Sequence, residues 1–178
     1  MPAPLNAPSR PRPLDDDASP AITRDTMTRG NGLALTIVAL LLRAGTGIVF
    51  IIAGVGKLGN ATAATVATQT ALGVGGTVAA ILATAISVTE ILLGVHLLIG
   101  LNLRWAAPAT ALLCAALLVV VIRLWVQGFT GGCGCFGVFG GGSPGPEETA
   151  RDAALLLAAL GAWATYRIGP ALDRRFDR

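Results

Sequence analysis

Long apolar segments are the feature that most constrains how this chain folds. An α-helix needs about 20 apolar residues to cross the hydrocarbon of a lipid bilayer. Four segments approach or exceed this length, and they lie at about 33–56, 74–100, 106–126 and 153–168. Charged residues make up 13% of the chain, about half of their usual share in soluble domains. The sequence therefore predicts an all-α protein, an integral membrane four-helix bundle that is embedded in the lipid bilayer.

Two parts of this pattern are less regular. The last apolar segment, 153–168, is the shortest of the four. The stretch 59–73 is rich in alanine and threonine and carries no charge. Its hydrophobic periodicity does not decide between a short interfacial helix and a loop, so both remain open.

Residues 1–32 predict a disordered cytoplasmic tail. Six prolines fall within the first twenty residues, and an acidic run of three aspartates follows at 15–17. A segment of this composition buries too little apolar surface to fold alone. The first apolar segment is long and begins at Leu33, whereas a signal peptide has a short one near the start of the chain. Residues 169–178 predict a second cytoplasmic tail.

Arginines are distributed unevenly around the four segments. They precede the first segment, separate the second from the third, and follow the fourth: Arg10, Arg12, Arg24, Arg29, Arg104, Arg167, Arg174, Arg175 and Arg178. Because arginine and lysine gather on the cytoplasmic side of membrane proteins, both termini are predicted to be cytoplasmic, in a multi-pass protein of the cell (plasma) membrane. The loop between the third and fourth segments is then external. The arginines account for the formal charge of +3, and no nucleic-acid partner is predicted.

That loop carries Cys133 and Cys135, with a single glycine between them. Two cysteines this close can form a small, strained disulfide ring, and strained, exposed disulfides are the labile or catalytic kind. Three cations, Lys57, Arg123 and Arg151, are predicted near the same face, where they would favour the nucleophilic thiolate. The pattern indicates a redox pair in a compartment where disulfides persist. An inert disulfide or two free thiols fit the same spacing.

No metal site is predicted from the cysteines. Two cysteines supply only half of the ligands of a tetrahedral zinc site. The third, Cys114, lies eight residues into the third apolar segment, roughly 12 Å from its inner end at 1.5 Å per residue. We interpret Cys114 as a small buried apolar residue.

Two charges interrupt the apolar segments. Arg43 lies ten residues into the first segment, and Glu90 lies ten residues before the inner end of the second at Gly100. Equal depth in neighbouring antiparallel helices predicts an Arg43–Glu90 pair, because an unpaired charge in hydrocarbon is expensive. Such a pair either fixes helix packing or forms a polar cavity for a proton path, a quinone head group or a small substrate. Lys57, at the end of the first segment, is the third charge of this region.

Several motifs are similar to those of one family. Arg43, the sequence Gly-Val-Gly-Lys-Leu at 54–58 and the sequence Glu-Ile-Leu-Leu-Gly at 90–94 resemble the first two helices of the DoxX-like membrane proteins. The sequence Cys-Gly-Cys-Phe-Gly at 133–137 resembles the loop of the methylamine-utilisation MauE branch. The resemblance covers about residues 33–168, and the loop is its most specific part.

The resemblance implies a four-helix membrane protein. It also assigns the redox pair to Cys133 and Cys135 and the membrane charges to Arg43, Lys57 and Glu90. MauE is associated with maturation of the disulfide-rich small subunit of periplasmic methylamine dehydrogenase. The expected function is therefore thiol–disulfide chemistry, by an oxidoreductase or its membrane subunit, that supports maturation of an exported disulfide-containing or thioredoxin-like partner.

Two other functions remain open at this point. One is a quinone-linked membrane subunit of an oxidoreductase complex, with quinone as its cofactor. The other is a small-molecule or metal-ion carrier that uses a cavity at Arg43 and Glu90. The long proline-rich tail and the uncharged stretch 59–73 both depart from the family pattern.

Overall fold

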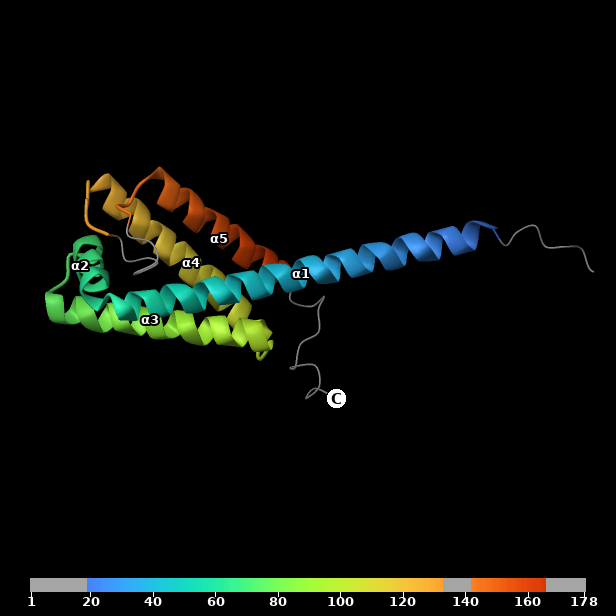
Figure 1. Ribbon diagram of the computed structural model, residues 1–178, viewed down its shortest axis with the longest axis horizontal. Coiled ribbons are helices and arrows are strands. Elements are labelled where there is room, and N and C mark those ends of the chain that lie inside the picture. The colour runs from blue at the N-terminus through green and yellow to red at the C-terminus, as the bar shows by residue number, and fades with distance from the viewer. Residues whose placement is uncertain (1–18, 133–141, 166–178) are drawn as a thin grey trace, which may run out of the picture. The chain divides into compact units, whose positions relative to one another are not determined.

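The structure is a computed structural model that describes residues 19–132 and 142–165, with side chains from Leu33 onward. Its elements are five helices: α1 Ser19–Gly59, α2 Ala61–Leu72, α3 Gly76–Ile99, α4 Leu103–Val126 and α5 Pro146–Ala164 (Figure 1). These two described ranges contain no strand, and the all-α prediction is confirmed for them. The helices that concern function belong to one compact unit, Leu35–Arg178.

Three helical segments are long and apolar enough to cross a membrane. They are Leu33–Gly59 of α1, Gly76–Ile99 and Leu103–Val126. The fourth predicted segment corresponds to α5, which does not meet the same criterion. Glu147, Glu148, Arg151 and Asp152 occupy its first two turns and shorten its apolar part.

Helix α1 begins earlier than the sequence predicts. The predicted tail covers residues 1–32, and helix α1 starts within it, at Ser19. Pro20 lies in the first turn, where its missing N–H leaves no helical hydrogen bond unmade. No further proline occurs before Pro108, and nothing interrupts the helix once it has started. Residues 1–18 and the predicted C-terminal tail, 169–178, lie outside the described residues.

The stretch 59–73, for which a helix and a loop were both open, forms helix α2. The Asn60 side chain caps its start by accepting a hydrogen bond from the Ala63 N–H at 3.4 Å. The helix ends at Gly73, whose φ of 68° is in the left-handed region that favours glycine. Alanines of α2 pack against α4 in a small core formed by Ala67, Ala71, Val121 and Leu124.

Helices α1 and α3 run antiparallel and approach closely at two glycine positions. A Cβ atom on Gly94 would lie 2.6 Å from the Gly47 carbonyl oxygen. A Cβ atom on Gly54 would lie 2.7 Å from the Ser87 carbonyl oxygen. Any larger side chain at these positions would force the two helices apart. The two contacts therefore fix the register of α1 against α3.

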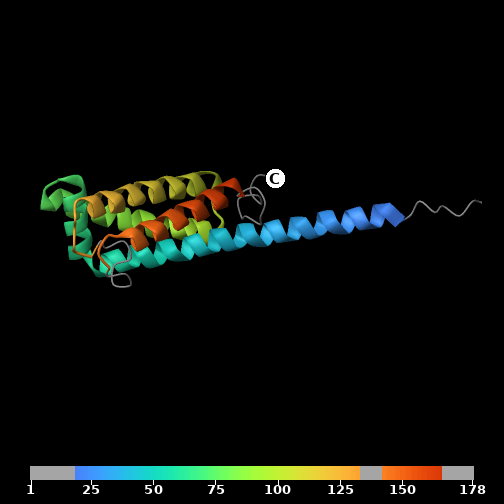
Figure 2. The ribbon, with the colours of Figure 1, turned by 90° about the horizontal axis from the view of Figure 1, so that it is seen from above.

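Helices α4 and α5 complete the core. Phe50 of α1, Ala111 and Cys114 of α4 and Ala159 of α5 form one buried cluster, with Leu93 of α3 packed against it. The end of α1, helix α2, the end of α4 and the start of α5 all lie at the same end of this unit (Figures 1 and 2). Helix α4 therefore ends, and helix α5 begins, at that end of the fold.

Candidate functional site: a buried ion pair beside a small cavity

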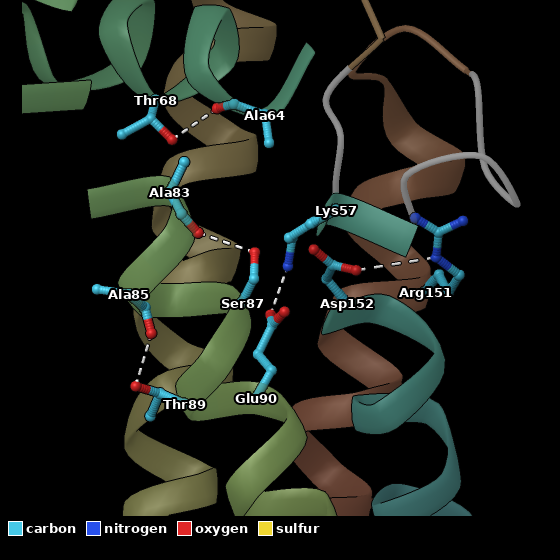
Figure 3. Close-up of polar contacts among 10 residues, drawn as sticks. All are labelled: Lys57, Ala64, Thr68, Ala83, Ala85, Ser87, Thr89, Glu90, Arg151 and Asp152. Atoms are coloured by element: carbon cyan, nitrogen blue, oxygen red, sulfur yellow. Dashed lines mark hydrogen bonds and ion pairs between the residues drawn. The ribbon is translucent and has the colours of Figure 1, made fainter. Parts of the chain in front are cut away.

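The most unusual polar contact in the core is an ion pair between Lys57 and Glu90. Lys57 lies in the last turn of α1, and its Nζ donates a hydrogen bond to Oε1 of Glu90, in the middle of α3 (Figure 3). Lys57 is 7% exposed and Glu90 is 1% exposed. Charges removed from water to this degree persist in folded proteins only when they are paired. The pair therefore explains how both residues are accommodated.

The predicted pairing of Glu90 with Arg43 is wrong. A Cβ atom on Gly54 would lie 3.3 Å from the Cβ of Glu90, so Glu90 lies beside Gly54 of α1. Arg43 lies eleven residues before Gly54 on α1, about 16 Å along the axis at 1.5 Å per residue. The prediction assumed that the two apolar segments start and end at the same depth. The register of α1 against α3 is set instead by side-chain packing between the two helices.

A second carboxylate, Asp152 of α5, belongs to the same cluster. Asp152 is 6% exposed, and one of its oxygens, Oδ1, lies 3.8 Å from Nε of Arg151. Arg151 also forms an ion pair with Glu148, one turn earlier in α5. Figure 3 shows the Asp152 carboxylate between Lys57 and Arg151. Helices α1, α3 and α5 thus each contribute a buried charged side chain.

A cavity of about 30 Å³ lies against this cluster. A water molecule needs about 10–15 Å³ of such space, so the cavity has room for about two. Its lining comes from α1, α3, α4 and α5: Val49, Phe50, Ala53, Lys57, Glu90, Cys114, Leu117, Asp152 and Leu155. Within the described part of the chain, Oε2 of Glu90 is buried and has no hydrogen-bond partner. The cavity is thus apolar except on the side of the charged groups.

A second cavity, of about 50 Å³, shares two of these lining residues, Lys57 and Leu117. Its remaining lining comes from α2, α3 and α4 and is almost entirely apolar, with Thr68 as its polar exception. The Lys57 side chain therefore borders both cavities. The two cavities therefore meet at the only lysine of the chain.

The family match extends over this whole arrangement. A family model described as "Methylamine utilisation protein MauE" matches residues 35–165. The chain belongs to the MauE family. The match includes every helix that lines the first cavity and the segment with Cys133 and Cys135, and the resemblance drawn from the motifs is confirmed. No curated protein and no solved structure matches the chain.

In this MauE family member, the structure assembles only some of the residues singled out from the sequence. It brings Lys57 and Glu90 together and places Arg151 beside Asp152. Arg123, near the end of α4, is exposed. Cys133 and Cys135 lie outside the described residues.

Cys114 is a free thiol that is buried in the wall of the first cavity. Its burial agrees with its interpretation as a small apolar residue. Among the described residues, no group of three or more histidine, cysteine or acidic side chains is arranged to hold a metal ion.

Sequence reasoning missed Asp152, although a signal for it was present. The predicted fourth span began at Ala153, which left Asp152 just outside. Asp152, Ala159 and Ala162 are buried, and Leu155 lines the cavity, so these four share one face of α5. Their spacing of three, four and three residues is the pattern of a helix face that packs against neighbours. Extending that face backward by one turn from Leu155 would have placed Asp152 in the core of the MauE fold.

Proposed function

We propose that this MauE family protein carries out thiol–disulfide chemistry at the external face of the membrane and supports maturation of an exported partner. The observation that carries the proposal is the family match, which spans both the Cys133–Cys135 segment and the helices that enclose the Lys57–Glu90 pair. The family description, methylamine utilisation, suggests methylamine dehydrogenase or a thioredoxin-like protein as the class of partner. Cys133 and Cys135 form the proposed redox pair.

The proposed topology has four spans, with α5 as the fourth. It is supported by the packing of α5 within the core, where Ala159 joins Phe50 of α1 and two residues of α4. A Cβ atom on Gly161 of α5 would lie 2.9 Å from Leu42 of α1, so α5 also runs close beside α1. With both termini cytoplasmic, as the arginines favour, the segment from α4 to α5 is external. Lys57 and Asp152 then lie near the external end of the bundle.

The proposed chemistry is an exchange between two dithiols. A thiolate of the partner attacks the Cys133–Cys135 disulfide and forms a mixed disulfide, and the second thiolate of the partner resolves it. The partner loses two electrons and gains a disulfide bond, while Cys133 and Cys135 gain the two electrons and become thiols. Reoxidation of the pair then passes the electrons to an acceptor, which is either the disulfide of a thioredoxin-like protein or a membrane quinone.

Trapping of the mixed disulfide tests this proposal. Cys133→Ser and Cys135→Ser are expressed separately with the full chain in its native membrane, and covalent complexes are sought on non-reducing gels. The exchange is reversible, so the single thiolate left in one of the two variants should attack the disulfide of the oxidised partner. No second cysteine of the loop is then present to release the mixed disulfide, and we expect a covalent complex that disappears on reduction. Cys114→Ser is the matched control and should trap nothing, because its thiol is buried. Absence of any complex, with normal partner maturation in the double serine variant, would refute the thiol function.

A carrier function is the second candidate. The Lys57–Glu90 pair and Asp152, which line a cavity inside an otherwise apolar core, provide the observation that favours it. A carrier of small polar molecules would depend on these charges and not on the loop cysteines. Transport that survives Cys133→Ser but is lost in Asp152→Asn would favour the carrier over the thiol function.

A further inference from the structure

The charged groups around the first cavity do not balance. Two of them are cations, Lys57 and Arg151, and three are carboxylates, Glu90, Glu148 and Asp152. Arg151 forms an ion pair with Glu148 at the start of α5. Arg151 also pairs with Asp152, so the two cations are shared among three carboxylates. The carboxylates of Glu90 and Asp152 extend toward Lys57 from α3 and α5 (Figure 3). With every group ionised, the cluster would carry one uncompensated negative charge.

No other described group near the cavity can supply the missing positive charge. Helix α4 contributes Cys114, which is neutral as a thiol, and otherwise apolar side chains. Helix α2 contains no titratable residue. Glu90 and Asp152 are each less than a tenth exposed, so water does not screen their mutual repulsion. Two carboxylates that share one buried site rarely stay ionised together, because the low dielectric disfavours the second charge.

The geometry around Glu90 also indicates a place for a proton. Only Oε1 of Glu90 takes part in the ion pair with Lys57. Oε2 is buried, and no described group donates a hydrogen bond to it. Glu90 and Asp152 line the same cavity of about 30 Å³, which has room for about two water molecules. Water there would join the two carboxyl groups by hydrogen bonds and let one proton pass between them.

We propose that Lys57, Glu90 and Asp152 form a proton-binding site in which one exchangeable proton is shared by the two carboxyl groups. With that proton the cluster is neutral, with one ammonium, one carboxylate and one carboxylic acid. The proton belongs to the pair of acids rather than to either one alone. This site goes beyond the thiol chemistry, and its test does not use the loop cysteines.

Infrared difference spectroscopy of the purified full-length protein in lipid nanodiscs tests the proposal. A protonated carboxylic acid has a C=O stretching band that is separate from carboxylate bands and shifts in heavy water. We expect this band at neutral pH in the unaltered protein and its loss in Asp152→Asn. Loss is also expected in Glu90→Gln, because either change leaves one carboxylate for one lysine.

Lys57→Met gives the opposite expectation. Without the ammonium group both carboxyl groups must be neutral, so the band should grow about twofold. Ser87→Ala is the matched control on α3, because Ser87 is buried one turn before Glu90 and its hydroxyl donates a hydrogen bond to the Ala83 carbonyl oxygen. It should leave the band unchanged, as should the Cys133→Ser, Cys135→Ser double variant.

Three results would overturn the proposal. The first is the absence of the band at neutral pH in the unaltered protein, which needs no substitution and so does not depend on the folding of a variant. The second is a band that persists in both Asp152→Asn and Glu90→Gln, since it would then come from other groups. The third is loss of the band when sodium chloride replaces choline chloride at constant pH, which would mean that the cluster binds a metal cation instead.

Discussion

Lys57 at the end of α1 and Glu90 in the middle of α3 form a buried ion pair across 33 residues of chain. The pair joins two of the helices that are long and apolar enough to cross a membrane. Buried ion pairs add little net stability compared with well-packed apolar residues, but removal of one partner is strongly destabilising. The pair therefore makes the packing of α1 on α3 depend on both residues.

Lys57→Met should destabilise the fold more than Glu90→Gln does. Loss of the lysine leaves Glu90 without its cation and Asp152 with Arg151 alone, and breaking a buried pair in this way typically costs about 3–5 kcal/mol. Loss of Glu90 still leaves Asp152 as a partner for Lys57, so its cost should be smaller. The variant with both substitutions should lose less stability than the sum of the losses in the two single variants. Thermal melting of the protein in detergent measures all three differences.

Arg43 provides a comparison for the single and double variants of Lys57 and Glu90. Arg43 and Glu90 are separated by about 16 Å along the helix axes at 1.5 Å per residue, and changes this far apart usually add. Arg43→Gln combined with Glu90→Gln should therefore lower the melting temperature by the sum of the single effects. Coupling between Arg43 and Glu90 of the size expected for Lys57 and Glu90 would contradict the register described here.

The glycine contacts between α1 and α3 lead to a second prediction. Gly94→Ala should destabilise the protein by about 1–3 kcal/mol, the usual cost of overpacking a core. The added Cβ would lie 2.6 Å from a backbone oxygen of α1, which cannot move alone. Gly45→Ala is the matched control, because nothing lies within 4 Å of its Cβ position. That change should be neutral or stabilising, since alanine is the better helix former.

If Gly94→Ala and Gly45→Ala gave the same melting temperature, the two helices would not approach at Gly94. The Lys57–Glu90 pair would then lose its structural basis as well, because the same register brings the two residues together. Detergent conditions are held constant between the variants so that the comparison reports on packing alone.

The sequence was sufficient to predict the helices that the hydrophobic effect governs directly. The segments 33–56, 74–100 and 106–126 each stand out because their length matches the hydrocarbon thickness, and the structure forms helices over all three. The stretch 59–73 could not be decided, because its alanines and threonines alternate without a clear apolar face. Its helix depends on a cap at Asn60 and on packing against α4.

The site was harder to predict because it depends on the register between helices. Counting from the ends of two apolar segments placed Arg43 and Glu90 at equal depth. A better guide was present in the small residues, since Gly47 and Gly54 are seven residues apart on α1 and Ser87 and Gly94 are seven apart on α3. Matching these small residues across the two antiparallel helices yields the observed register and brings Lys57 within reach of Glu90.

The topology leads to a third prediction, which rests on the arginine distribution. After mild reduction of intact cells, a membrane-impermeant maleimide should label Cys133 and Cys135. Cys114 should stay unlabelled until the protein is denatured, because it is buried in the core. Mass spectrometry of the labelled peptides distinguishes the three thiols. Labelling of the loop cysteines only after cell lysis would mean that the loop faces the cytoplasm.

The last prediction concerns the redox behaviour of Cys133 and Cys135. A catalytic pair exchanges electrons with partners, so its reduction potential should lie above about −300 mV, the region below which structural disulfides resist reduction. A disulfide ring of three residues, two cysteines and the glycine between them, is strained, and strain raises the reduction potential. The purified protein is equilibrated with thiol–disulfide buffers of graded potential, and an alkylating reagent that adds mass reports the state of each thiol. The Cys114→Ser background removes the third thiol from the measurement without touching the loop. The oxidised and reduced forms should interconvert with a midpoint above that limit, whereas a pair that stays oxidised well below it would be a structural disulfide and would contradict the proposed function.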